Sequence, residues 1–280
     1  MKTLLSLGHG YSAQALGRIL PRADWRIIGT TRDAEGAARL AELGVEPMVW
    51  PGADLTPHLR TATHILTSIA PDRDGDPFLR AHGPLMRTLT PEWVGYLSTT
   101  AVYGDHDGGW VDETTPAAPT TARGEQRMHA ERAWLETGLP VHVFRLAGIY
   151  GPGRGPFAKV RDGTARRIIK PGQVFSRIHV DDIAQVLRAS MARPDPGAIY
   201  NVCDDDPAPP QDVIAHAAEL LGLPMPPAVP YDEAEMTPMA RSFYAESKRV
   251  RNDRIKTELG VRLIHPDYRS GLAALLAREG

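Results

Sequence analysis

The stretch Lys2-Thr3-Leu4-Leu5-Ser6-Leu7-Gly8-His9-Gly10-Tyr11-Ser12-Ala13 begins at the second residue of the chain and decides its fold. The apolar run before Gly8 predicts a buried strand, and the residues from Tyr11 to about Leu20 predict a helix. Gly8 permits a tight turn between them, Gly10 lets the backbone approach a pyrophosphate, and the small Ala13 lets the helix pack on the strand. The backbone N–H groups at such a helix start form an anion site for phosphate.

The context of this loop matters, because a G-x-G-x-x-A pattern alone is weak evidence. Here a predicted strand precedes the pattern, a helix follows it, and a second strand comes about 20 residues later. We therefore predict a dinucleotide-binding site that begins with Gly8, Gly10, Tyr11, Ser12 and Ala13. The alternative is a glycine-rich turn that holds no ligand.

The end of the second strand bears on the choice of dinucleotide. The strand Trp25–Gly29 runs into Thr30-Thr31-Arg32, and no Asp or Glu occupies positions 28–32. NAD-binding units usually place an acid here for the ribose hydroxyls, whereas hydroxyls followed by a guanidinium suit a phosphate. Asp33 comes late and could simply cap the next helix. We predict NADP(H) in preference to NAD(H), with Thr31 and Arg32 as cofactor contacts, and a solvated loop charge at Arg32 is the alternative.

The bulk composition narrows the class of protein. The chain has 280 residues with 32 basic and 34 acidic side chains, and its net charge of −2 argues against a nucleic-acid or membrane surface. No stretch predicts a signal peptide or a membrane-spanning helix. The single cysteine, Cys203, excludes an internal disulfide and fits a reducing cytoplasm. The ten histidines form no close cluster with Cys or acids, so we expect no metal.

The first half of the chain alternates strand and helix signals, which predicts an α/β protein with a Rossmann-type, doubly wound parallel sheet. After Gly151 this rhythm breaks in a Gly- and Pro-rich loop and returns only near Val174. Asp181 or Asp182 can cap the helix predicted over 183–192. The other predicted strands are 45–50, 63–69, 93–98, 141–146 and 198–202, and the other predicted helices include 34–43, 78–89 and 125–137.

This pattern divides the chain into two parts. Residues 1–150 plus about 174–203 form the predicted dinucleotide-binding domain. Residues of about 151–173 plus 204–280 form a smaller, discontinuous C-terminal domain. We expect the smaller domain to bind the substrate over the carboxyl edge of the sheet, where open α/β sheets bind ligands.

Five further stretches resemble the extended short-chain dehydrogenase/reductase family, the NAD-dependent epimerase/dehydratase group. They are Leu97–Gly104 (LSTTAVYG), Phe144–Gly153 (FRLAGIYGPG), Arg177–Ala184 (RIHVDDIA), Ile199–Val202 (IYNV) and Asn252–Gly260 (NDRIKTELG). Together with the glycine loop they follow the order of the family and span nearly the whole chain. The resemblance implies a Rossmann-type fold and a nicotinamide dinucleotide as cofactor.

The resemblance also implies roles at matching positions. Thr99, four residues before the Tyr of V-Y-G, would hydrogen-bond a substrate oxygen that undergoes redox, with Thr100 as a further substrate contact. The alternative for Thr99 is a turn hydroxyl that satisfies the backbone. The strand-end residues Ser68, Ile69 and Ala70 would line the nicotinamide side of the cofactor, and Asp54 and Leu55 would lie near the adenine.

The chain departs from the family at Y-x-x-x-K, in which Tyr is the general acid/base and Lys holds the nicotinamide ribose. With Glu131 as the anchor, Arg123 occupies the Tyr position and Arg127 the Lys position of this helix. An arginine cannot shuttle protons at neutral pH, because its pKa stays above about 12. Arg127 could still position the ribose, and Arg123 could bind an anionic group or stabilise an oxyanion. Alternatively, both are solvated helix residues, with Glu131 as a surface partner of Arg127.

Four other side chains could supply an acid or a base. Tyr103 and Tyr150 lie on loops at the expected edge of the site, and His129 falls on the candidate helix. His179 is expected to be structural, held near a strand end. For each of them packing or solvation is a more common role than catalysis.

Arg177 is a candidate substrate contact. The arginine with which the family grips a nucleotide-sugar diphosphate falls on Phe175, so nucleotide sugars are doubtful substrates. We expect an atypical NADP(H)-dependent enzyme that reduces or epimerises a small substrate, which could be anionic. The alternatives are a dinucleotide-binding sensor or scaffold that lost the acid/base pair, and an isomerase that uses the cofactor transiently. A homodimer is a further expectation, because family members often pair through helices.

Overall fold

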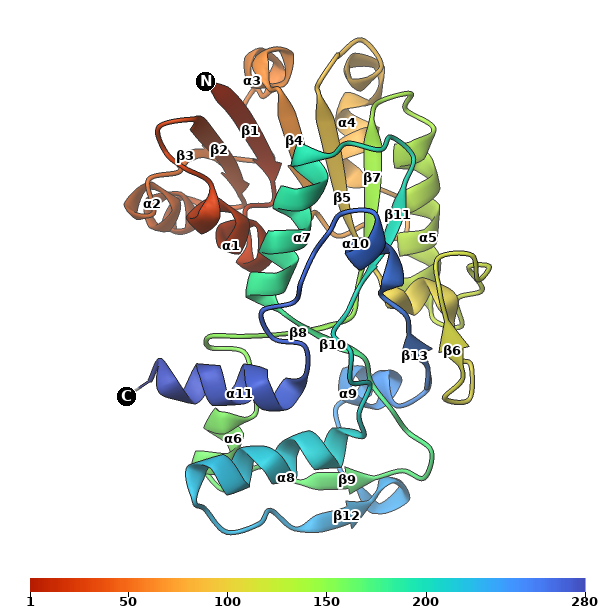
Figure 1. Ribbon diagram of the computed structural model, residues 1–280. Coiled ribbons are helices and arrows are strands. Elements are labelled where there is room, and N and C mark those ends of the chain that lie inside the picture. Colours follow the sequence, from red (N-terminus) through yellow and green to blue (C-terminus); the bar gives the residue numbers. More distant parts are fainter. Residues whose placement is uncertain (280) are drawn as a thin grey trace.

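The computed structural model describes residues 1–279 and has two lobes (Figure 1). The larger lobe is a sheet of seven strands in which every neighbouring pair is parallel. The strand order is β11 (Ile199–Val202), β7 (Val141–Leu146), β5 (Trp93–Thr99), β4 (His64–Thr67), β1 (Lys2–Leu7), β2 (Trp25–Thr31) and β3 (Glu46–Val49). The order changes direction between β1 and β4, the place where such sheets bind ligands. The predicted α/β fold class is confirmed.

Helices cover both faces of this sheet. They are α1 (Tyr11–Ile19), α2 (Ala34–Glu42), α3 (Thr56–Thr61), α4 (Pro77–Met86), α5 (Ala122–Leu135) and α7 (Val180–Ala192). Leu4 of β1 packs in a cluster with α1, α2 and α7, whereas its neighbour Leu5 packs with α3, α4 and α5. Successive side chains of a strand point to opposite faces, so one apolar run supplies both cores.

The smaller lobe lies beyond the carboxyl ends of the strands (Figure 1). It contains β8 (Gly148–Tyr150), α6 (Phe157–Arg161), β9 (Arg167–Ile169), β10 (Arg177–His179), α8 (Pro210–Leu221), β12 (Ala228–Pro230), η2 (Tyr231–Glu233), α9 (Pro238–Phe243) and α11 (Tyr268–Ala277). Its own apolar cluster includes Phe157, Ala217 and Leu272. A separate core is what two packed units require, and the exact domain boundaries stay a prediction.

Short elements join the lobes: η1 (Thr100–Tyr103), β6 (Trp110–Val111), β13 (Arg249–Val250) and α10 (Asp253–Thr257). β6 pairs with β13 in parallel. Ile255 of α10 belongs to the core of the larger lobe, together with Leu259 and Val261. This segment therefore lies with the sheet, although its position in the sequence groups it with the C-terminal domain. None of the helices described for residues 1–279 has the length and apolar character needed to cross a membrane.

The start of α7 differs from the sequence expectation. His179 caps this helix, because its Nδ1 accepts a hydrogen bond from the backbone N–H of Asp181 at 3.1 Å. Asp182 instead accepts hydrogen bonds from the backbone N–H groups of Ile264 and His265, at 2.7 and 3.0 Å, and so ties α7 to the C-terminal loop. The prediction of an aspartate cap at 181 or 182 was wrong, because the helix begins at Val180, ahead of its apolar pattern.

Candidate functional site

The glycine loop lies between β1 and α1, as predicted. Gly8 has a φ of +76°, and its N–H donates to the Thr30 hydroxyl at 2.7 Å. The Ser68 hydroxyl donates to the Gly8 carbonyl and holds the loop from the other side. These two hydrogen bonds fix the turn to the neighbouring strands. The Ser68 side chain therefore stabilises the glycine loop itself.

The first turn of α1 is open to an anion. Gly10 is its N-cap and offers no side-chain hydrogen bond, and no acidic residue lies in that turn, which begins with Tyr11, Ser12 and Ala13. A Cβ placed on Gly10 would have only the Gly8 carbonyl oxygen, at 3.9 Å, within contact range. The uncapped N–H groups and the space in front of them fit the pyrophosphate of a dinucleotide.

The end of β2 leaves one cation unpaired. Arg32 is exposed and has no hydrogen bond or ion pair with any of residues 1–279. Asp33, the next residue, accepts a hydrogen bond from the Gly36 N–H at 2.7 Å and caps α2. Thr31 packs against Gly36, where a side chain would collide with its hydroxyl. Among residues 1–279, these contacts leave the Arg32 guanidinium available to a ligand at the end of β2.

The remaining predicted cofactor residues line the neighbouring strand ends. Ile69 is half-buried and Ala70 is exposed after β4. Asp54 is exposed and accepts a hydrogen bond from the Thr56 N–H at 2.9 Å, which lowers its pKa. Leu55 is fully buried at the start of α3. Asp54 and Leu55 therefore organise this helix start, whichever cofactor lies beside it.

Thr99 and Thr100 stand at the carboxyl end of β5. Both are half-buried, and the Thr99 hydroxyl accepts a hydrogen bond from the Ala101 N–H at 3.3 Å as the cap of η1. The hydroxyl hydrogen of Thr99 is not used in that bond, so it can still be donated to a substrate oxygen. The turn role of Thr99 is therefore present, and it leaves the substrate role open.

Arg123 and Arg127 lie on the first turns of α5. Gly124 lets this helix start approach η1, because a Cβ there would be 2.8 Å from the Ala101 carbonyl oxygen. Arg127 donates to the Leu97 carbonyl at 2.7 Å and lies over the Tyr96 ring at 5.7 Å. Arg123 is exposed and makes no hydrogen bond or ion pair among the described residues. The two arginines therefore differ: Arg127 is hydrogen-bonded to the sheet, whereas the N–H groups of the Arg123 guanidinium have no hydrogen-bond acceptor among the described residues.

Glu131 is not a surface residue. It is 3% exposed, pairs with Arg145 of β7 at 2.8 Å, and accepts a hydrogen bond from the Ser98 hydroxyl. The alternative that made Glu131 a solvated partner of Arg127 was wrong, because the anchor residue of the motif points into the sheet. This pairing fixes the rotation of α5 and so directs Arg123 and Arg127 to the carboxyl edge.

The other candidate acids and bases have structural positions. Tyr103 is fully buried and donates its hydroxyl hydrogen to Asn201 Oδ1 at 2.7 Å. Burial raises the pKa of Tyr103, and likewise that of Tyr150, whose hydroxyl donates to the Asp267 carbonyl at 3.3 Å. His129 is exposed on α5. These placements favour packing or solvation for all three residues.

Two charged residues near the site were missed by sequence reasoning. Arg154 is exposed and lies over the Tyr11 ring at 5.8 Å, while the Tyr11 hydroxyl donates to the Pro152 carbonyl at 3.0 Å. Asp204 is 2% exposed, and burial raises its pKa to about 8. The contact between Arg154 and Tyr11 has no local sequence signal, because it joins segments that are far apart in the chain.

Arg177 is held by backbone carbonyls. Its Nη1 donates to the carbonyls of Phe175 and Ala208, at 2.8 and 3.0 Å. Burial lowers its pKa, and Asp204 opposes that shift. A substrate contact at Arg177 stays a prediction.

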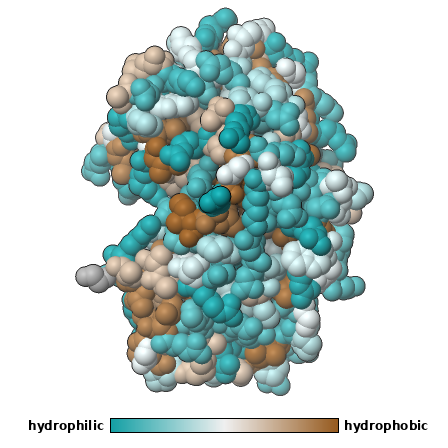
Figure 2. All heavy atoms as spheres, in the orientation of Figure 1, coloured by the Kyte–Doolittle hydropathy of each residue, from teal (hydrophilic) through white to brown (hydrophobic). Residues whose placement is uncertain are grey.

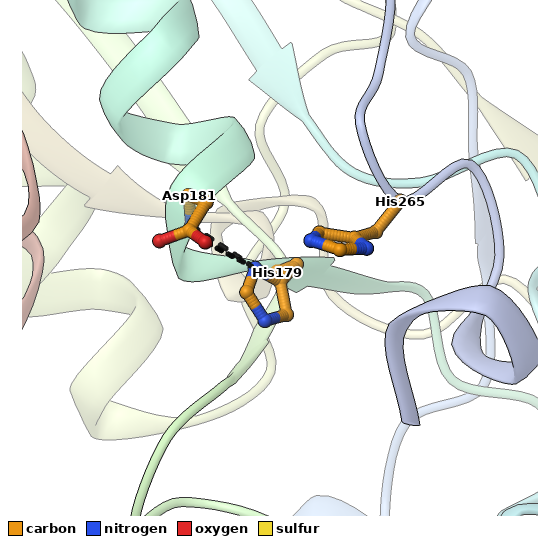
Figure 3. Close-up of side chains that lie close together, drawn as sticks. All are labelled: His179, Asp181 and His265. Atoms are coloured by element: carbon orange, nitrogen blue, oxygen red, sulfur yellow. Dashed lines mark hydrogen bonds and ion pairs between the residues drawn. The ribbon is translucent and has the colours of Figure 1, made fainter. Parts of the chain in front are cut away.

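His179, Asp181 and His265 lie close together at the start of α7, a cluster that the sequence analysis did not predict. The rings of His179 and His265 have their centres 4.0 Å apart, and Asp181 Oδ2 lies 3.7 Å from His179 Nδ1 (Figure 3). Asp181 also accepts a hydrogen bond from Arg278 at 2.9 Å. A metal cation there would meet the positive end of α7 and the Arg278 guanidinium, and His179 Nδ1 already accepts the capping bond. The cluster therefore favours a structural role.

Figure 2 shows the surface hollowed on its left side, between the lobe with α1 and α2 and the lobe with α11. The glycine loop and the loop with Pro152 and Arg154 meet on this side, joined by the Tyr11 hydroxyl. A small molecule held by α1 would lie between the lobes.

Comparison with known proteins gives concordant results. The model of the NAD dependent epimerase/dehydratase family matches residues 84–203. Protein YeeZ of Escherichia coli K12 is 30% identical over 244 residues, which cover 81% of this chain and 86% of that protein. A solved structure, that of "a functionally unknown conserved protein from Silicibacter pomeroyi DSS", is 64% identical with a TM-score of 0.95 and covers 100% of this chain and 99% of its own. A "3-diazoavenalumate denitrifying reductase" of a Streptomyces species is 31% identical over 177 residues, which cover 58% of this chain and 55% of that protein.

Proposed function

Because the chain belongs to the NAD-dependent epimerase/dehydratase family, we propose that it is a reductase that binds NADP(H) and acts on a small anionic substrate. The observation that carries the proposal is the pairing of an uncapped first turn of α1 with the unpartnered Arg32 at the end of β2. The helix start would bind the pyrophosphate, and Arg32 would grip the 2′-phosphate that distinguishes NADP(H) from NAD(H). NAD(H) remains the alternative cofactor.

The reacting end of the site would use residues of β5 and α5. The nicotinamide of a bound cofactor supplies a hydride. Thr99 would donate its free hydroxyl hydrogen to a substrate oxygen, and Arg123 would hold a carboxylate or a developing oxyanion. Arg127 is held by the Leu97 carbonyl, so it contributes positive charge from a fixed position. No residue of this set releases a proton at neutral pH.

A reaction without a proton donor on α5 suits particular hydride acceptors. Replacement of the nitrogen of an aryl diazonium by hydride breaks a C–N bond, forms a C–H bond and releases N2, and it consumes no proton. The name of the Streptomyces relative joins a diazo compound to a reductase activity. We therefore include small carboxylates with an aryl diazonium group among the candidate substrates, beside carbonyl compounds whose oxyanion Arg123 would stabilise and water would protonate.

The test is transfer of label from NADPH deuterated at C4 to a panel of keto and aryl diazonium carboxylates, followed by mass spectrometry. We expect one deuterium in the product and a rate that is flat between about pH 6 and 9, because arginines stay protonated there. Arg123→Gln should lower kcat/KM by about 100-fold, whereas Arg132→Gln, at an exposed position on the same helix, should not. NADPH binding without label transfer to any member of the panel would support the sensor or scaffold instead.

A further inference from the structure

The helix α9 exposes apolar side chains beside the site. Met239 is 68% exposed and Phe243 is 52% exposed. The two residues are four positions apart, so they share one face of the helix. An exposed apolar face with charged groups at its rim is typical of a binding surface.

Arg123 lies against this face. Its guanidinium carbon is 5.8 Å from the centre of the Phe243 ring, and this contact joins α5 of the larger lobe to α9 of the smaller lobe. A guanidinium that stacks on a ring keeps the N–H donors in its own plane free. Because Arg123 has no hydrogen bond or ion pair within residues 1–279, those donors are available to a ligand.

Aromatic side chains hold α9 in this position. Tyr244, which follows the helix directly, lies edge-on to Phe175 with ring centres 5.4 Å apart and is 5.5 Å from Tyr231. Lys170 donates a hydrogen bond to the Tyr244 carbonyl. These contacts fix the end of α9, and they hold Phe243 next to Arg123.

The charges around Arg123 favour an anion. Arg123 is exposed, but the protein around it removes part of its hydration; this desolvation, together with the positive charges of Arg127 and Arg154, lowers the pKa of the Arg123 guanidinium. No carboxylate is paired with any of these three arginines in the described chain. A negatively charged ligand would relieve this repulsion.

We propose that Arg123 and Phe243 form a subsite for a planar, conjugated carboxylate such as an aryl acid. A carboxylate bound through two hydrogen bonds lies in the plane of the guanidinium, and conjugation extends that plane into the rest of the acid. The aromatic part then extends along the apolar face that Phe243 and Met239 expose, where a flat ring makes more contact than a saturated ring. The inference rests on the proposed function, because it places the acid beside the nicotinamide end of the cleft.

Calorimetric titrations with cinnamate and with 3-cyclohexylpropanoate test this subsite, since the two acids carry equal charge and differ in planarity. We expect cinnamate to bind about tenfold more tightly to the wild type, in line with stacking and cation–π energies. Phe243→Leu should bring the ratio close to one, and Arg123→Gln should weaken both acids about tenfold. Met225→Ala, at an exposed apolar residue of the same lobe, should leave both affinities unchanged.

Equal affinity for the two acids, no cinnamate binding, or an unaltered ratio in Phe243→Leu would each overturn the subsite. The titrations are run with and without saturating NADP+, and NADP+ binding is measured separately. If the wild type did not bind NADP+, the proposed function would be wrong, but the ratio of the two acid affinities would still test the subsite. A thermal melt of each variant checks that it is folded.

Discussion

Arg123 limits the chemistry open to this chain, because a guanidinium holds its proton throughout the physiological range. The sequence was sufficient to find Arg123 and Arg127, since Glu131 set the register within one helix. It was not sufficient to find Phe243 as the neighbour of Arg123, because the two residues are about 120 positions apart and meet only through the packing of α9. Local patterns identify a helix face, and only the fold identifies what lies opposite.

The buried residue Glu131 gives a prediction about the stability of the protein. It forms a buried ion pair with Arg145, whose side chain is 6% exposed. Glu131→Ala should lower the free energy of unfolding by about 3–5 kcal/mol, because it leaves a buried guanidinium without its partner. Urea denaturation measures the loss. The double variant Glu131→Leu with Arg145→Met should recover much of it, and an equal or larger loss in the double variant would contradict this explanation.

At the scale of elements, the alternation of strands and helices in the larger lobe was predictable. Apolar runs such as that of β1 are long enough to identify buried strands, and Asp33 was correctly considered as the cap of α2. The start of α7 was not predictable in the same way, because His179 is an uncommon cap and its ring is fixed by contacts with Tyr150 and His265. The strands of the smaller lobe are only three residues long, which is too short for a periodic pattern.

The cap of α7 makes stability depend on pH. Burial, reinforced by the charge of His265 and opposed by that of Asp181, lowers the pKa of His179 from 6.5 to about 4. Between these two pH values the His179 side chain is protonated in the unfolded chain and neutral in the folded chain. The contribution of this group to the free energy of unfolding is therefore fully present above about pH 6.5 and is lost as the pH drops toward 4. The loss from this group is on the order of 2–3 kcal/mol.

Chemical denaturation at several pH values measures this effect. His179→Asn keeps a capping acceptor and removes the titrating group, so its unfolding free energy should fall less steeply between pH 6.5 and 4. His179→Ala should also lose about 1 kcal/mol at pH 8, because it removes the cap. A slope in His179→Asn as steep as that of the wild type would assign the pH dependence to other groups, such as the buried His9 and His64, whose pKa values are also lowered to about 4.

At the scale of the whole molecule, the two lobes meet beyond the carboxyl ends of the strands (Figure 1). The larger lobe contributes the glycine loop, Arg32 and Arg123, and the smaller lobe contributes α9 and the loop with Arg154. The break in rhythm after Gly151 is the basis for predicting two domains, and their boundaries stay a prediction. The sequence did not indicate that the segment around α10 packs against the sheet, because nothing local to Ile255 identifies the core that it joins. A homodimer stays a prediction.

The most direct measurement is a side-by-side fluorescence titration of the protein with NADPH and NADH. We predict that NADPH binds at least about tenfold more tightly, and that Arg32→Gln removes the difference by weakening NADPH alone. Arg18→Gln, at an exposed position at the far end of α1, is the matched control and should change neither affinity. NADH binding as tightly as NADPH would contradict the role of Arg32, and binding of neither nucleotide would contradict the glycine loop as a dinucleotide site.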